Sequence, residues 1–136
     1  MKGNDMRDGL NKDDVAFEIN FYNGLIRRNP NFVEALVALG DLYTKAGMYQ
    51  EGLAVDEKLV QLKPEDPIVL YNLACSYSLL NEIDKAFRAF KKAIHCGYYD
   101  FEHLEQDSDL SNLRRDRRFQ QYLARIKEKM PSKIAE

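Results

Sequence analysis

The chain repeats itself every 34 residues, and this period constrains the fold more than any other feature of the sequence. Pro30 recurs as Pro64, and Tyr43 recurs as Tyr77. The other matching positions pair Leu36 with Leu70, Leu39 with Leu73, Gly40 with Ala74, Gly52 with Ala86, Lys58 with Lys92 and Val60 with Ile94. A fixed period of this length is typical of chains that stack one supersecondary unit on the next. Because such stacks expose extended surfaces, the period predicts binding of a peptide or protein.

Composition and charge exclude several classes of protein. The 136 residues suit one domain, and 45% of them are hydrophobic, which is enough for a core and argues against global disorder. The formal net charge of −2 argues against a general nucleic-acid binder. No apolar run approaches the ~18 residues of a membrane span, so no membrane partner is expected. The polar start, Met1 to Asp5, does not resemble a signal peptide, and a cytoplasmic location is expected.

No residue pattern predicts catalysis or a bound cofactor. The sequence contains no glycine-rich phosphate loop and no nucleophile motif, so the chain is predicted not to be an enzyme. His95, Cys96 and His103 match no standard zinc spacing, and neither a metal nor a cofactor is expected. Cys75 and Cys96 are interpreted as two thiols in a reducing compartment, with a disulfide between them as the alternative.

Apolar spacing and helix-ending residues predict an all-α chain. Residues 1–12 are expected to form a disordered leader. A helix capped by Asp13 or Asp14 then ends before Pro30. Further helices are predicted over 32–45, capped by Asn31, and over 49–62, 67–79 and 83–95. Because short turns join them, these helices form antiparallel pairs, and the small residues Gly40 and Ala74 allow the paired helices to approach closely.

At these positions the chain resembles the tetratricopeptide repeat family. Its 34-residue unit has leucine, a small residue and tyrosine at its seventh, eighth and eleventh positions, matched here by Leu39, Gly40 and Tyr43 and again 34 residues later. Asp56 and Tyr98 depart from the aromatic residue and the proline of the family pattern. The resemblance implies an α-solenoid of about two and a half repeats. Its predicted parts are a lone second helix over 13–30 and full repeats over 31–64 and 65–98.

The repeat fails after Tyr98. Asp107 and Ser111 stand where the family pattern requires leucine and tyrosine. Since the end of a solenoid needs a polar face, a helical C-terminal cap is predicted over 99–129. Helical turns are expected over 100–105 and 108–114, and a last helix over 116–129 that packs on Ala86 and Phe90. Its packing residues are predicted to be Phe119, Tyr122, Leu123 and Ile126. Residues 130–136 are predicted to be a loose tail.

The resemblance also implies a ligand groove, because the first helix of each tetratricopeptide pair lines the concave surface. The residues at the corresponding positions are Glu34, Val37, Asp41, Thr44, Ile68, Tyr71, Asn72, Cys75 and Leu79, together with Ala38, Lys45 and Ser78. Their mixture of apolar and acidic side chains predicts a peptide ligand that is apolar and carries a basic residue. The alternative is that they are solvated residues of a short stack.

One known ligand mode of the family does not fit the sequence. The clamp on a C-terminal carboxylate uses lysine, arginine and asparagine at five groove positions. This chain has Val37, Asp41, Asn72, Glu102 and Gln106 there, and only Asn72 matches. Without the cations, a carboxylate would lose its hydration with nothing to compensate it. The resemblance to carboxylate-binding members therefore stops at the fold.

Charge is segregated in the C-terminal part. Residues 100–109 hold five acids, and residues 111–125 hold five arginines and one acid. One interpretation is that the two blocks pair with each other, and the other is a patch for an anionic partner.

The sequence thus predicts a non-catalytic module for protein–protein interaction that acts as an adaptor or scaffold. Its partner would be a peptide or protein segment held in the concave groove. The alternative function is assembly through an end or the convex face, for which a homodimer is the simplest case.

Overall fold

The structure, a computed structural model, describes residues 11–130 and divides the chain into two compact units, 1–64 and 65–136. All secondary structure within the described residues is helical, which confirms the predicted all-α class. Most of the predicted leader and tail lies in 1–10 and 131–136, outside the described residues. None of the described helices is both long enough and apolar enough to span a bilayer.

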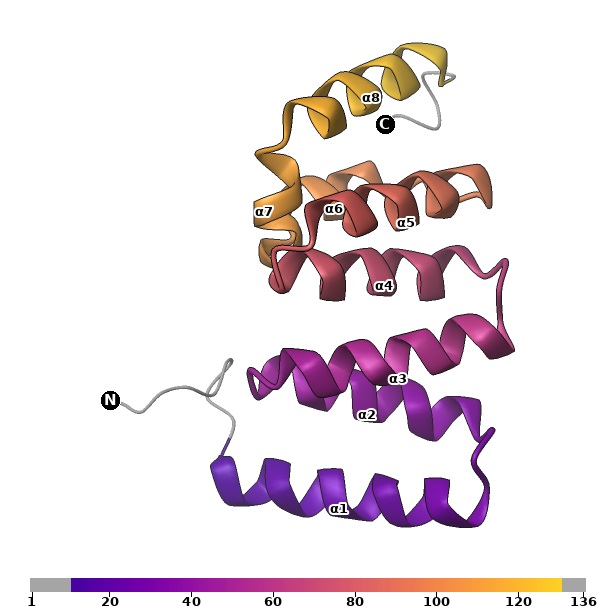
Figure 1. The fold of residues 1–136 in the computed structure, drawn as a ribbon, viewed down its shortest axis with the longest axis vertical. Coiled ribbons are helices and arrows are strands. Elements are labelled where there is room, and N and C mark those ends of the chain that lie inside the picture. The colour runs from indigo at the N-terminus through magenta and orange to yellow at the C-terminus, as the bar shows by residue number, and fades with distance from the viewer. Residues whose placement is uncertain (1–10, 131–136) are drawn as a thin grey trace. The chain divides into compact units, whose positions relative to one another are not determined.

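The first unit contains three helices, α1 (Lys12–Arg28), α2 (Val33–Lys45) and α3 (Tyr49–Leu62), and α2 packs against both of the others (Figure 1). The α1 cap differs from the prediction. Asn11, rather than Asp13 or Asp14, caps this helix, and its Oδ1 accepts the Asp13 N–H at 2.8 Å. Both aspartates therefore fall within the first turn, where the helix dipole favours acids.

The start of α2 also differs from the prediction. Asn31 was expected to cap this helix, but the residue at the cap position is Phe32, which makes no side-chain cap bond. The Phe32 N–H donates to the Asn29 carbonyl at 3.1 Å, so Asn31 belongs to the preceding turn. The helix therefore begins at Val33, one residue later than the sequence pattern indicated.

Small residues let the two helices of the α2–α3 pair approach closely, as predicted for Gly40. A Cβ atom on Gly40 would lie 3.3 Å from Asp56 Oδ1 and 3.4 Å from Val55 Cγ1 on α3. Gly52 on α3 faces α2 in the same way, because its Cβ would lie 3.3 Å from Thr44 Oγ1. These contacts are tighter than ordinary van der Waals distances, which explains why the first repeat has glycine at both positions.

The second unit begins with the antiparallel pair α4 (Pro67–Leu79) and α5 (Ile83–His95). Asp66 caps α4, with its Oδ1 accepting the Ile68 N–H at 2.9 Å. The turn between the helices contains Asn81 at φ 60°, and the corresponding turn of the first unit contains Gly47 at φ 77°. Both residue types tolerate this left-handed conformation, which ends a helix within one residue.

The cap completes the second unit with α6 (Phe101–Gln106), the 3₁₀ turn η2 (Ser108–Leu110), α7 (Ser111–Arg114) and α8 (Arg117–Lys129). These elements agree with the predicted ranges within one residue. Phe119 on α8 packs against Phe90 on α5 with ring centroids 4.8 Å apart, and Tyr122 meets Phe87 edge-on at 5.8 Å. The predicted docking of the last helix on α5 is therefore correct for Phe119 and Tyr122.

Candidate functional site

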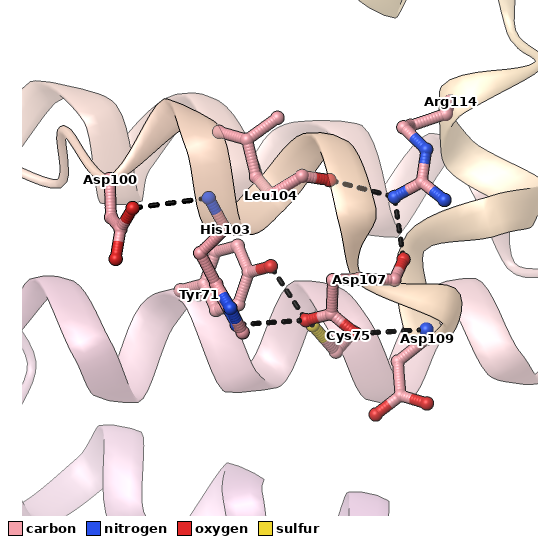
Figure 2. Close-up of polar contacts among 8 residues, drawn as sticks. All are labelled: Tyr71, Cys75, Asp100, His103, Leu104, Asp107, Asp109 and Arg114. Carbon is pink, nitrogen blue, oxygen red and sulfur yellow. Dashed lines mark hydrogen bonds and ion pairs between the residues drawn. The ribbon is translucent and has the colours of Figure 1, made fainter. Parts of the chain in front are cut away.

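Three of the predicted groove residues, Tyr71, Cys75 and Ser78, lie beneath the cap. Tyr71 and Cys75 are one turn apart on α4, and their side chains point at the segment that joins α6 to η2 (Figure 2). Tyr71 is 3% exposed and Cys75 is 6% exposed. The cap therefore occupies the part of α4 that was expected to meet a ligand.

Asp107 forms the centre of this contact. Its Oδ2 accepts the Tyr71 hydroxyl at 2.7 Å and lies 3.3 Å from His103 Nε2 and 3.7 Å from Cys75 Sγ. Its Oδ1 accepts the Asp109 N–H at 3.0 Å, which starts the η2 turn. A carboxylate with several donors around it is a strong hydrogen-bond acceptor. Asp107 thus attaches the cap to α4 and shapes the chain after α6.

Arg114 fixes the same segment from the other side. Its Nη1 donates to the Leu104 carbonyl at 2.7 Å and to the Asp107 carbonyl at 2.5 Å (Figure 2). The last carbonyls of a helix have no partner within the helix, and a cation there also favours the helix dipole. One arginine therefore completes the end of α6.

Ser78 forms a second attachment point of the cap on α4. The Leu113 N–H donates to Ser78 Oγ at 3.1 Å, and Asn112 Nδ2 donates to the Ser78 carbonyl at 2.9 Å. Ser78 is fully buried, although the repeat pattern placed it among the groove positions. Buried polar groups in proteins are paired in this way because an unpaired one costs free energy.

Tyr71 also stacks on Tyr98, which follows α5. The two rings are nearly parallel, with an interplanar angle of 6° and centroids 4.3 Å apart. Burial away from water raises the pKa of both phenols far above the usual tyrosine value, because the charged phenolate would lose its hydration. Nearby acidic groups, including Asp107, raise the pKa of Tyr71 further.

This environment predicts a loss of stability in alkali. The unfolded chain releases tyrosine protons near pH 10, whereas folded Tyr71 and Tyr98 keep theirs. The free energy of unfolding is therefore expected to fall as the pH rises above about 10. Urea denaturation between about pH 8 and 11 measures this fall, and Tyr71→Phe is expected to make it shallower. If the free energy of unfolding of Tyr71→Phe and of Tyr98→Phe fell as steeply with pH as that of the natural chain, these two tyrosines would not be the cause of the alkaline loss of stability.

The remaining predicted residues of α4 are more accessible. Ile68 is 56% exposed, Asn72 is exposed, and Leu79 is half-buried. Ile68 and Asn72 are four residues apart and share one face of the helix. They form an accessible apolar and amide pair on the second unit.

The predicted residues of α2 form a face of the first unit. Glu34, Val37 and Asp41 are exposed, with Val37 at 44%, and Thr44 is half-buried. Asp41 pairs with Lys45 at 3.1 Å, an exposed contact between residues four apart. Such pairs contribute only about 0.3–0.5 kcal/mol, so Asp41 remains available to a cationic ligand. The accessible α2 face thus combines one apolar side chain with two carboxylates.

The acidic block of the C-terminal part contacts a cation that lies beyond the arginine block. Lys127 on α8 contacts Glu105 of the acidic block at 2.6 Å. Arg118 instead pairs with Asp84 on α5 at 2.7 Å and with Asp116 at 3.0 Å. Hydrogen bonds from Arg118 and from the α8 backbone hold the pKa of the Asp116 carboxyl below its usual range. Arg118 therefore attaches the first turn of α8 to α5.

The cysteines and histidines of the described region form no ligand set. Neither Cys75 nor Cys96 is in a disulfide. Within residues 11–130, no three histidine, cysteine, aspartate or glutamate side chains gather as they would around a metal ion. His103, one of the three residues whose spacing matched no standard zinc site, lies 3.3 Å from Asp107 Oδ2.

Comparison with known protein families matches this architecture. A tetratricopeptide repeat model matches residues 33–66 and 68–94, which hold the α2–α3 and α4–α5 pairs. Two segments of this chain are tetratricopeptide repeats. The match confirms the resemblance stated from the sequence. The α1 helix and the cap lie outside the matched tetratricopeptide segments.

A relative with a longer chain is similar to more than half of this chain. This relative, a protein of Arabidopsis thaliana whose name describes it as chloroplastic, is 35% identical over 89 residues. The aligned part covers 63% of the present chain and 27% of the relative. The present chain therefore spans about a quarter of the length of the curated relative that it matches, in a region that here contains tetratricopeptide repeats.

The sequence did not predict that Asp107, Tyr98 and Arg114 hold the cap and the end of the tetratricopeptide repeats together. Asp107 attracted attention only because it replaces the leucine of the family pattern, and Tyr98 because it replaces the proline. The run Asp107-Ser108-Asp109 is a cap signature for a short helix and could have placed the α6 terminus. The tertiary hydrogen bond from Tyr71 has no such local signal, because it joins residues 36 positions apart.

Proposed function

We propose that this chain is a non-catalytic protein-binding module, an adaptor or scaffold that takes a peptide or protein segment on the first helices of its tetratricopeptide repeats. Such repeats generally mediate protein–protein interaction. The observation that carries the proposal is the exposed side chain of Val37 on α2, which lies between the exposed acids Glu34 and Asp41.

The chemistry of this face suggests the kind of ligand. An apolar side chain of the ligand would cover Val37, and a lysine or arginine next to it would approach Glu34 or Asp41. The second unit presents its own contacts on α4, where Ile68 is an exposed apolar side chain and the Asn72 amide offers both a donor and an acceptor to a ligand backbone. Tyr71 and Cys75, also on α4, become accessible only when the cap lifts, because Asp107 covers them here.

A peptide array tests the proposal directly. We expect the full chain to bind apolar peptides with a basic residue, and Val37→Asp to weaken that binding about tenfold or more, because it removes the apolar contact. Glu34→Lys is expected to weaken the same peptides by placing like charges together. Glu51→Lys is the matched control, since Glu51 is an exposed acid in the first turn of α3.

Two outcomes would contradict the binding surface. The first is unchanged peptide binding in Val37→Asp, Glu34→Lys and an Ile68→Asp/Asn72→Ala double variant. The second is an equal loss in Glu51→Lys, which would indicate a general charge effect. Circular dichroism of each variant verifies that the helices remain intact.

A second candidate function is assembly with another copy or with a larger complex. The observation that favours it is a pair of exposed phenylalanines on α1, Phe17 at 71% and Phe21 at 53%. Monomeric proteins rarely keep large apolar side chains together on the surface without a use for them. Sedimentation over a concentration series separates the two functions, because a strict monomer favours the adaptor.

The location of the protein is also a matter for proposal. The free thiols of Cys75 and Cys96 suit a reducing compartment such as the cytoplasm, whereas the name of the Arabidopsis relative describes that protein as chloroplastic. We propose the cytoplasm as the working location. Imaging the full chain with a fluorescent tag at its C-terminus tests this, and a plastid signal would overturn it.

A further inference from the structure

The α1 helix has two apolar faces, and only one of them packs within the first unit. Val15 is 3% exposed, and Asn23 Nδ2 donates to Tyr43 Oη on α2 at 3.2 Å, so these residues mark the packed face. Phe17 and Phe21 project from the other side and are 71% and 53% exposed. They are four residues apart and therefore lie one above the other on the helix. No described element covers them.

The face of α1 that carries Phe17 and Phe21 also carries charged residues toward both ends of the helix and a glycine near its C-terminal end. Spacings of three and four residues place Asp14 before Phe17, and Gly24 and Arg28 after Phe21. A Cβ atom on Gly24 would come near only Arg27 Nη2, at 3.8 Å. This face therefore has an acid at one end, a cation at the other, two aromatic rings in the middle and a shallow seat beside them.

We infer that this face binds the α1 helix of a second copy of the chain, antiparallel to the first. In this arrangement Phe21 of one copy lies opposite Phe21 of the second copy. Because the helices run in opposite directions, any two residues that face each other have numbers that add up to about 42. Phe17 then lies over the second copy's Gly24, where the missing side chain leaves room for the ring. Asp14 lies beside the second copy's Arg28. Two-fold symmetry produces the Phe17–Gly24 and Asp14–Arg28 contacts twice, and the contact between the two Phe21 rings once.

Charge decides between this arrangement and the parallel one. In a parallel pair, Asp14 would face Asp14 and Arg28 would face Arg28, so both ends would repel. In the antiparallel pair, both ends attract, and the acidic first turn of each helix meets the basic last turn of the other. Two helices cover less area than a standard interface of about 1,600 Å², so the dimer is expected to be weak and dependent on salt.

A charge-exchange experiment tests the inference on the full chain by sedimentation velocity over a concentration series. The natural chain is expected to dimerise as its concentration rises. Asp14→Arg alone and Arg28→Glu alone are each expected to weaken the dimer about tenfold, since each puts like charges together at both ends. An equimolar mixture of the two variants is expected to restore dimers, because each contact then joins opposite charges.

Two further variants separate the interface from folding. Gly24→Leu fills the seat of Phe17 and is expected to weaken the dimer, while helix content by circular dichroism is unchanged. Glu51→Arg changes the charge as Asp14→Arg does, but on α3, and is expected to leave the dimer intact. A natural chain that stays monomeric at millimolar concentration would overturn the inference. A mixture that stays monomeric, or a dimer that tolerates Gly24→Leu, would overturn the antiparallel pairing.

The inference rests on the assembly function proposed above and not on peptide binding by α2. The peptide array with the Asp14→Arg chain distinguishes the two. Retained peptide binding without a dimer would show that only the assembly function depends on α1. A dimer in a chain that binds no peptide would leave the inference standing and remove the adaptor.

Discussion

Replacing Phe119 with alanine is expected to lower the free energy of unfolding by about 3–5 kcal/mol, the range for deleting a buried aromatic ring. Phe119 is 1% exposed and packs on Phe90, which is itself fully buried. The substitution would leave a cavity between α8 and α5 and remove the main apolar contact of the last helix. Urea denaturation followed by circular dichroism measures the change through the midpoint of the transition.

Two further variants show whether the loss of stability comes from the packing of Phe119 or from any substitution in α8. Phe119→Leu keeps most of the side-chain volume and is expected to cost about 1–2 kcal/mol. Arg117→Ala, an exposed change at the start of the same helix, is expected to cost less than about 0.5 kcal/mol. If Phe119→Ala cost no more than Arg117→Ala, the docking of α8 on α5 would be wrong.

Replacing Asp107 with alanine is expected to cost about 3 kcal/mol, because it leaves the buried Tyr71 hydroxyl without its acceptor and removes the start of η2. The cap would then be held mainly by Ser78 and by apolar contacts. Asp107→Asn keeps an acceptor oxygen without the charge, so it is expected to cost about half as much. The same urea denaturation measures both changes.

A double-mutant cycle shows whether the cost comes from the bond to Tyr71. Tyr71→Phe removes the hydroxyl and keeps the ring stacked on Tyr98. Combined with Asp107→Ala, it is expected to cost less than the sum of the single changes by about 1 kcal/mol or more, since both remove the same bond. Additive costs would mean that Asp107 stabilises the cap through its other contacts alone.

The repeats could be predicted from the sequence because their determinants are local. Helix ends follow from residues such as Asp66 and Gly47, whose capping and left-handed conformations depend on near neighbours. Close packing of the α2–α3 pair follows from Gly40, which has no side chain to separate the helices. The two errors in helix starts differ in kind: at α1 three nearby residues, Asn11, Asp13 and Asp14, can each act as a cap, whereas α2 begins after Phe32 without any side-chain cap.

The candidate site was less predictable, because it depends on where the cap crosses α4. The repeat pattern assigned Tyr71, Cys75 and Ser78 to an open surface, since an intact tetratricopeptide stack would leave them there. The structure places all three under the cap, held through Asp107, Asn112 and Leu113. These contacts join residues more than 30 positions apart, and their geometry follows from the place where α6 ends. Val37 and Ile68, which no such contact reaches, are exposed.

The burial of Cys75 gives the chain an internal reporter of cap opening. Its sulfur lies 3.7 Å from Asp107 Oδ2 beneath the α6–η2 segment, so an alkylating reagent reaches it only when that segment lifts. Cys96 lies just after α5 and is only half-buried, which provides a reference thiol in the same molecule. The ratio of the two labelling rates therefore measures how often the cap exposes the α4 surface.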